Sequence, residues 1–243
     1  MAALLFGLVV LSSLLISGML YLDFIAASPI FLLLVGGFHI VVAIIFYRGY
    51  RHYHAVHRLV TAGRGELFLL AITNLIHSTR IPALRDHYRL RKCQGLVLTG
   101  QPLEALVAAE EYHREVKRPG SDALAIMAAE VEANLQLGQL DWSRQALERS
   151  EEHQGSEKSF LLQAVAARLT SFSGAHDEAA RALSNLLKVQ HFPWTRSIRC
   201  RNLFWYGQAL RELGRQSEAT EALSKAHRQA PNSHYGQLAA RPW

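Results

Sequence analysis

The sequence predicts an all-α protein in which an apolar N-terminal hairpin precedes an array of about five helix-turn-helix units. Two long stretches near the N-terminus carry no Asp, Glu, Lys or Arg. The rest of the chain has apolar residues at helical spacing and no credible strand pattern, and a glycine recurs there every 36–40 residues. We therefore divide the chain into a transmembrane helical hairpin (1–47), a helical repeat domain (48–232) and a C-terminal capping tail (233–243).

The hairpin is predicted from two apolar runs, 2–22 and 29–47, with a short break between them. A helix rises ~1.5 Å per residue, so each run spans roughly 28–32 Å, about the hydrocarbon thickness of a bilayer. The segment before the first run lacks the Lys or Arg of a signal peptide, and the run is longer than the usual apolar region of one. We therefore expect both runs to be retained as membrane-spanning helices.

Basic residues follow the second run directly and are absent from the break between the runs. Because Lys and Arg accumulate on the cytoplasmic side, this pattern predicts a two-span protein with both termini in the cytoplasm, for example in a bacterial inner membrane. Aromatic residues accompany the basic ones, which is typical of a segment at the lipid headgroups. The expected membrane-interface residues are Arg48, Arg51, His52, Tyr53, His54, His57 and Arg58.

The repeat is defined by three markers that recur in phase. A glycine is expected to end the first helix of each unit in the left-handed conformation, and a proline is expected to close the second helix. An acidic residue followed by alanine comes four and five residues after three of the glycines, where it suits the first turn of a helix and a close helix contact. The markers are Gly63, Gly100, Gly138, Gly174 and Gly214; Pro82, Pro119, Pro193 and Pro231; and Glu104-Ala105, Glu178-Ala179 and Glu218-Ala219.

The last unit, 203–231, resembles a tetratricopeptide (TPR) repeat. It has small residues at Gly207, Ala219 and Ala226, the turn at Gly214 and the closing Pro231, with Leu223 at a packing position. The resemblance is fair for 160–193 and weaker for 86–119 and 124–157. Departures from the family pattern are Phe68 in the unit 49–82, where a small residue belongs, Ser143 in place of an alanine, and Lys92 and Glu130 at apolar positions.

The resemblance implies a protein-binding role, because first-helix residues of such arrays line a concave groove that holds an extended peptide or a partner helix. Chaperone-binding members use Lys and Asn in this groove to hold a terminal carboxylate, and those residues are absent here, so that ligand is not expected. The groove positions in this chain are Leu90, Gln94, Val97, Glu132, Leu135, Arg168, Ser171, Phe204, Gln208 and Arg211.

Signals of enzymatic chemistry are missing from the sequence. It has no glycine-rich phosphate loop, no GxSxG, no HExxH and no paired-carboxylate motif, so we expect no catalytic activity and no cofactor. Cys93 and Cys200 form no CxxC and are expected to be reduced core residues. The formal charge of +6 arises from opposing acidic and basic blocks rather than one basic face, which argues against nucleic acid as a partner.

These observations predict a membrane-anchored adaptor that binds other proteins and contacts membrane lipid. Two alternatives remain open. One is an accessory subunit of a larger membrane complex. The other is a role in haem or cofactor handling, since two N-terminal membrane helices followed by helical repeats resemble the layout of HemY-type proteins. His39 and the histidines near residue 54 would be the ligands there, although no carboxylate or cysteine lies near them in sequence.

Overall fold

The computed structural model describes residues 37, 40, 54–116, 123–152, 160–189 and 196–241. Apart from Gly37 and Ile40, which are helical, the predicted spans 2–22 and 29–47 lie outside the described residues. Among the helices that are described, none is both long and apolar enough for a membrane crossing.

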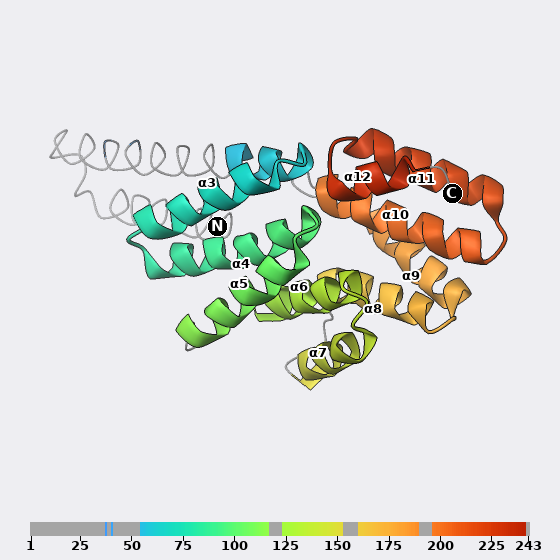
Figure 1. Ribbon diagram of the computed structural model, residues 1–243, viewed down its shortest axis with the longest axis horizontal. Coiled ribbons are helices and arrows are strands. Elements are labelled where there is room, and N and C mark those ends of the chain that lie inside the picture. The colour runs from blue at the N-terminus through green and yellow to red at the C-terminus, as the bar shows by residue number, and fades with distance from the viewer. Residues whose placement is uncertain are drawn as a thin grey trace, which may run out of the picture. The chain divides into compact units, whose positions relative to one another are not determined.

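Residues 54–243 form a compact unit made of paired helices, each packed on the next in chain order (Figure 1). No strand occurs among the described residues, and the part they cover is a solenoid of paired helices. Residues 54–61 are helical and precede α3 (Gly65–Ser78); the later pairs are α4 (Pro82–Leu98) with α5 (Pro102–Glu115), α6 (Ala123–Gln136) with α7 (Leu140–Glu152), α8 (Phe160–Phe172) with α9 (His176–Val189), and α10 (Arg196–Glu212) with α11 (Gln216–Gln229), followed by the short α12 (His234–Ala239).

The five predicted turn glycines are confirmed. All have positive φ, between 67° at Gly63 and 89° at Gly174. At Gly100 the glycine N–H donates to Val97 O (3.1 Å) and the next N–H donates to Leu96 O (2.9 Å), and the equivalent two bonds recur at the other four glycines. A left-handed residue with this pair of bonds is a Schellman helix end, which explains why glycine marks the period.

Pro82 has a different role from the one expected. Helix α3 ends at Ser78, and Pro82 is the first residue of α4. Proline is tolerated in the first turn because the N–H that it lacks has no helical partner there. Pro82 therefore begins a helix instead of closing the previous one, whereas Pro231 does follow the end of α11. Pro119 and Pro193 lie outside the described residues.

The small residues after the turns pack where helices meet. Ala105, Ala179 and Ala219 are buried, whereas the glutamate before each of them is exposed. Gly207 fills the same role on α10, because a Cβ there would lie 2.8 Å from the Leu223 side chain of α11. The small residues on these helices allow α9, α10 and α11 to pack closely.

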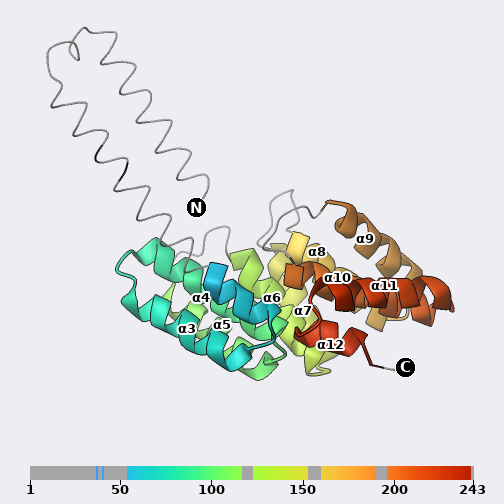
Figure 2. The same ribbon diagram turned by 90° about the horizontal axis from the view of Figure 1, so that it is seen from above.

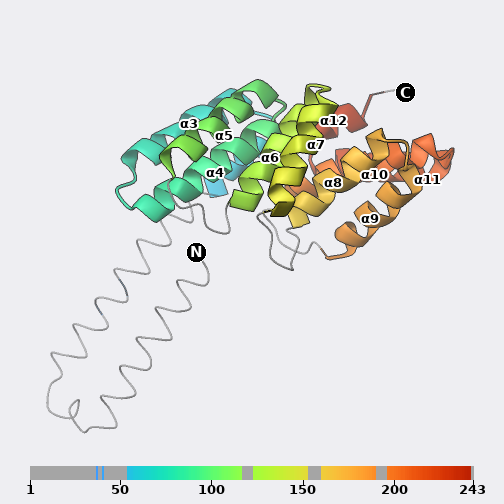
Figure 3. The same cartoon turned by 90° about the horizontal axis from the view of Figure 1, so that it is seen from below.

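The first helices of the units form an inner layer. Helices α4, α6, α8 and α10 contact one another in that order, and α10 also contacts α4 (Figures 2 and 3). Helix α12 packs on α10 and α11. The residues around it reach the turns of the first two units, because a Cβ at Gly63 would lie 1.9 Å from Asn232 O and one at Gly100 would lie 2.5 Å from His234 Nδ1. The C-terminal segment therefore joins the last unit to the beginning of the array.

Candidate ligand-binding groove

The inner layer carries the predicted groove positions, and the structure divides them into a closed part and an open part. Gln94, Val97 and Glu132 line a small cavity, and Leu90 is a core residue at 2 % exposure. The remaining positions line two open hollows between α6, α8, α10 and α12. These are Leu135, Arg168, Ser171, Phe204, Gln208 and Arg211.

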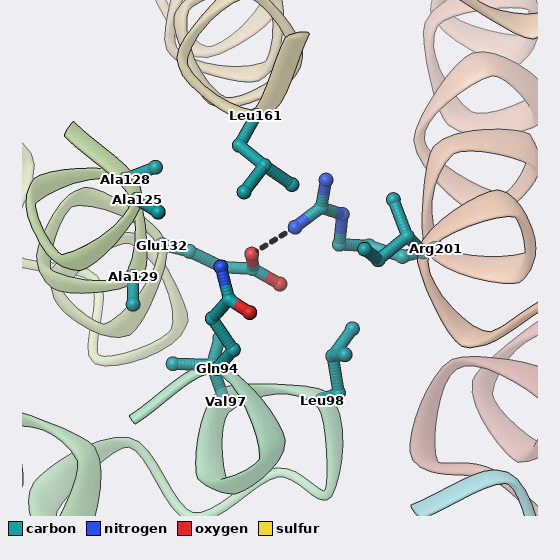
Figure 4. Close-up of a pocket in the computed structure, with 10 residues that line it drawn as sticks. Gln94, Val97, Leu98, Ala125, Ala128, Ala129, Glu132, Leu161 and Arg201 are labelled. Carbon is teal, nitrogen blue, oxygen red and sulfur yellow. Dashed lines mark hydrogen bonds and ion pairs between the residues drawn. The ribbon is translucent and has the colours of Figure 1, made fainter. Parts of the chain in front are cut away.

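The closed part is organised by a buried ion pair between Glu132 of α6 and Arg201 of α10 (Figure 4). Figure 4 shows Gln94 and Val97 on α4 and Leu161 on α8 around the same pair. Burial raises the pKa of the Glu132 carboxyl, and the guanidinium of Arg201 works against that rise. The cavity measures only about 20 Å³, a volume comparable to one water molecule, so a peptide does not fit there.

Helix α12 closes this region from the other side. The Tyr235 hydroxyl donates to Glu132 Oε1 (2.7 Å), and Gln136 Nε2 donates to both the Tyr235 oxygen (2.7 Å) and Val97 O (2.9 Å). The Tyr235 ring also contacts the rings of Phe204 and Trp205, with centroids 5.6 and 5.8 Å away. Burial raises the pKa of Tyr235 well above its usual value, so this hydroxyl stays a hydrogen-bond donor.

The open part consists of two hollows of about 370 and 210 Å³. Arg168, Phe172 and Gln208 line both, so the two hollows meet at these residues. The larger hollow extends toward Leu135 of α6 and Leu238 of α12, and its wall is mainly apolar and aromatic. We call the two hollows together the Arg168 pocket.

Arg168 is the central polar group of this pocket. Its guanidinium carbon lies 4.3 Å from the Phe172 ring centroid, a cation–π contact. Burial lowers the pKa of Arg168 to about 10, and the negative charge of Glu212 offsets this desolvation only in part. The acid of the pocket, Glu212, lies 3.6 Å from the guanidinium of Arg211 instead.

One polar side chain of the smaller hollow, that of Ser171, is held across the turn of the fourth unit. Ser171 Oγ lies 3.0 Å from His176 Nδ1, across the turn between α8 and α9. The amide oxygen of Gln208 is buried without a hydrogen-bond partner. The pocket therefore combines one cationic group with unsatisfied amide chemistry and an apolar wall, which suits a ligand that carries both a carboxylate and apolar groups.

Several residues of this site are absent from the sequence-based prediction. Arg201 lies one helical turn before Phe204, and Gln136 lies one turn after Glu132, so helical spacing places both on the predicted groove face. Tyr235 carries no such signal, because its partner Glu132 is 103 residues away in sequence.

The predicted membrane-interface residues are described only in part. Arg48, Arg51, His52 and Tyr53 lie outside the described residues. His54 and His57 are half-buried and Arg58 is exposed; burial lowers the pKa of His57. In the described part of the chain no three His, Cys, Asp or Glu side chains are grouped to hold a metal ion.

Comparison with known proteins finds likeness to solved structures alone. No family model and no curated protein matches the chain. Two crystal structures of a putative kinesin light chain with nearly identical TPR-like repeats from Podosopora anserina, one of them a point variant, are each 18% identical to the chain with a TM-score of 0.43. Each alignment covers 75% of this chain and 94% of the other.

Proposed function

We propose that the chain is a membrane-anchored adaptor that recruits other proteins through its TPR-like array. The observation that supports the proposal is the Arg168 pocket, an open hollow on the inner layer of the array. The TPR-like fold is consistent with a protein-interaction scaffold, and the proposal assigns it no catalytic step. The two N-terminal apolar runs, 2–22 and 29–47, are proposed to hold the array on the cytoplasmic side of a membrane.

Anchoring gives such an adaptor a simple mechanism. A partner bound to the array stays near the membrane, so its effective concentration toward a membrane target rises without any new contact between the two. Membrane lipid is then a second partner, contacted by the basic and aromatic residues that follow the second apolar run.

A second candidate is an accessory subunit of a larger membrane complex. It is favoured by exposed leucines on α3, where Leu67 and Leu70 are 48 % and 61 % exposed and suit a stable apolar interface. The two candidates differ in stoichiometry. A complex subunit co-purifies with its neighbours in fixed ratio in mild detergent, whereas an adaptor yields substoichiometric partners.

The adaptor proposal is tested by photocrosslinking in living cells. A photoreactive amino acid is placed at Gln208 or Arg211 in the pocket and, as a control, at exposed Ser224 on α11. We expect the two pocket positions to form adducts with the same proteins, identified by mass spectrometry, and Ser224 to form none of them. Equal adducts at all three positions, or none at the pocket, would contradict a partner site on the inner layer.

A further inference from the structure

Building on the adaptor role, we propose that the Arg168 pocket binds an acidic side chain within a partner polypeptide, with the carboxylate paired to Arg168. The resulting contact is a charge-assisted hydrogen bond in a partly desolvated site, the kind of polar contact that contributes most to binding. A segment with Asp or Glu next to apolar residues is the chemistry that this pocket fits.

The first argument is the weak compensation of the charge on Arg168. Among the described residues no carboxylate lies within ion-pair distance of its guanidinium, which lies over the ring of Phe172. Two other arginines of the inner layer do have carboxylate partners: Arg201 is paired with Glu132, and Arg89 is paired with two acids. A partly buried cation in an open hollow is stabilised when an incoming carboxylate replaces the lost hydration.

The second argument is the position of Arg168 between the two hollows. A polypeptide that ended at Arg168 with its terminal carboxylate would fill one hollow and leave the other without contacts. A chain that continues through both places residues on either side and brings an internal acidic side chain to the arginine. The geometry therefore favours Asp or Glu over a chain terminus.

The third argument is the chemistry of the other side chains that line the pocket. Leu135, Phe204 and Leu238 make one side of the larger hollow apolar. Gln208, next to Arg168, has an amide oxygen without a partner, and such an oxygen accepts a backbone N–H of an extended segment. An apolar residue beside the acidic one therefore has a site of its own in the larger hollow.

The test is a peptide selection on the full-length chain purified in mild detergent. A phage library of random peptides is used in which each peptide is fused through its C-terminus, so that no free terminal carboxylate is present. We expect the peptides enriched by the wild-type chain to carry Asp or Glu at one fixed position, next to an apolar residue. The probe for affinity is the resulting consensus peptide, acetylated and amidated, measured by fluorescence anisotropy.

Substitutions then identify the residue that recognises the acidic side chain of the peptide. We expect Arg168→Gln in the protein to lower affinity roughly tenfold or more, and Asp→Asn or Glu→Gln in the consensus peptide to have the same effect. Combining the protein change with the peptide change is expected to add little further loss of affinity. The matched control is Arg181→Gln on the exposed surface of α9, whose arginine pairs with Asp177 outside the pocket. Circular dichroism of each variant separates loss of binding from loss of fold, and Arg168→Lys, which keeps the charge, is expected to retain part of the acid preference.

Each outcome decides between the proposals. Enriched peptides without an acidic residue, or an acid preference that persists in Arg168→Gln, would overturn the carboxylate assignment while leaving the adaptor role intact. Binding only of peptides with a free C-terminus would replace the internal acid by a terminal one. No enrichment over the empty support would count against a peptide-binding groove altogether, and with it against the adaptor proposal.

Discussion

At the residue scale, the bulky or charged residues that depart from the repeat pattern are each matched by a specific neighbour. Phe68 stands where a small residue is expected, and Gly95 of α4 leaves the space for its ring, because a Cβ at Gly95 would lie 2.0 Å from Phe68 Cζ. Lys92 is paired with Glu111 (3.0 Å). In each case the bulky or charged residue is matched by a neighbour whose identity the repeat pattern does not specify.

The Phe68–Gly95 contact gives a direct test. We expect Gly95→Ala to lower the free energy of unfolding by about 1–3 kcal/mol, because the added methyl group overpacks the helix contact. In a Phe68→Leu background the same substitution is expected to be neutral or to stabilise by up to about 1 kcal/mol through helix propensity. Chemical denaturation of the four proteins measures the coupling. Equal effects of Gly95→Ala in both backgrounds would show that the two residues do not compete for space.

Glu130, the other charged residue at an apolar position, makes stability depend on pH. Its carboxylate lies 2.8 Å from His113 Nε2, and this hydrogen bond is the main cause that raises the pKa of His113. A raised histidine pKa contributes stability that is complete below the unfolded value of about 6.5 and is lost as pH rises through the folded value.

The expected effect is obtained by comparing the wild-type chain with Glu130→Gln at about pH 6 and about pH 8. The stability advantage of the wild type should be larger at the lower pH, by less than about 1 kcal/mol because His113 is 39% exposed. His57 and His234, whose pKa values are lowered by burial, act in the opposite direction but cancel in the difference. An advantage that grows toward pH 8 would contradict the assignment.

At the element scale, helix ends could be predicted from sequence and helix partners only in part. The turn at Gly100 is local, because its φ and its two hydrogen bonds involve only backbone groups within residues 96–101. The role of Pro82 could not be predicted, because a proline between two helices suits either the end of one or the start of the next. The docking of α12 on the inner layer depends on Tyr235 meeting Glu132, a contact that no repeat period encodes.

The prediction at this scale concerns α12 as the closure of the inner layer. We expect Tyr235→Phe to lower the free energy of unfolding by about 1–3 kcal/mol, because Glu132 and Gln136 lose a buried partner while the ring packing is kept. Tyr206→Phe on α10 is the matched control, since Tyr206 packs beside the core of the last units. Hydrogen exchange should also accelerate around Gly63 and Gly100, whose turns contact Asn232 and His234. Unchanged exchange there would mean that α12 stabilises only the last unit.

At the scale of the whole molecule, the array and the N-terminal apolar runs combine into the proposed adaptor. The array has its own packed interior, so its fold follows from the period and the small residues described above. The groove could be placed on the inner layer from the resemblance, but its division into a closed and an open part could not. That division depends on the pairing of Arg201 with Glu132 and on a cavity too small for a ligand.

The last prediction concerns how the chain is placed in a membrane. We expect the full chain to remain in the membrane pellet after an alkaline carbonate wash, because two apolar runs of roughly bilayer length resist extraction. A fluorescent reporter fused after Trp243 should be active, and alkaline phosphatase fused at the same place inactive, if Arg48, Arg51 and Arg58 keep that side in the cytoplasm. Replacing these arginines by glutamine and adding lysines to the break at 23–28 should reverse the two readouts. Phosphatase activity in the unaltered chain would refute the orientation, and release by the wash would refute the anchor itself.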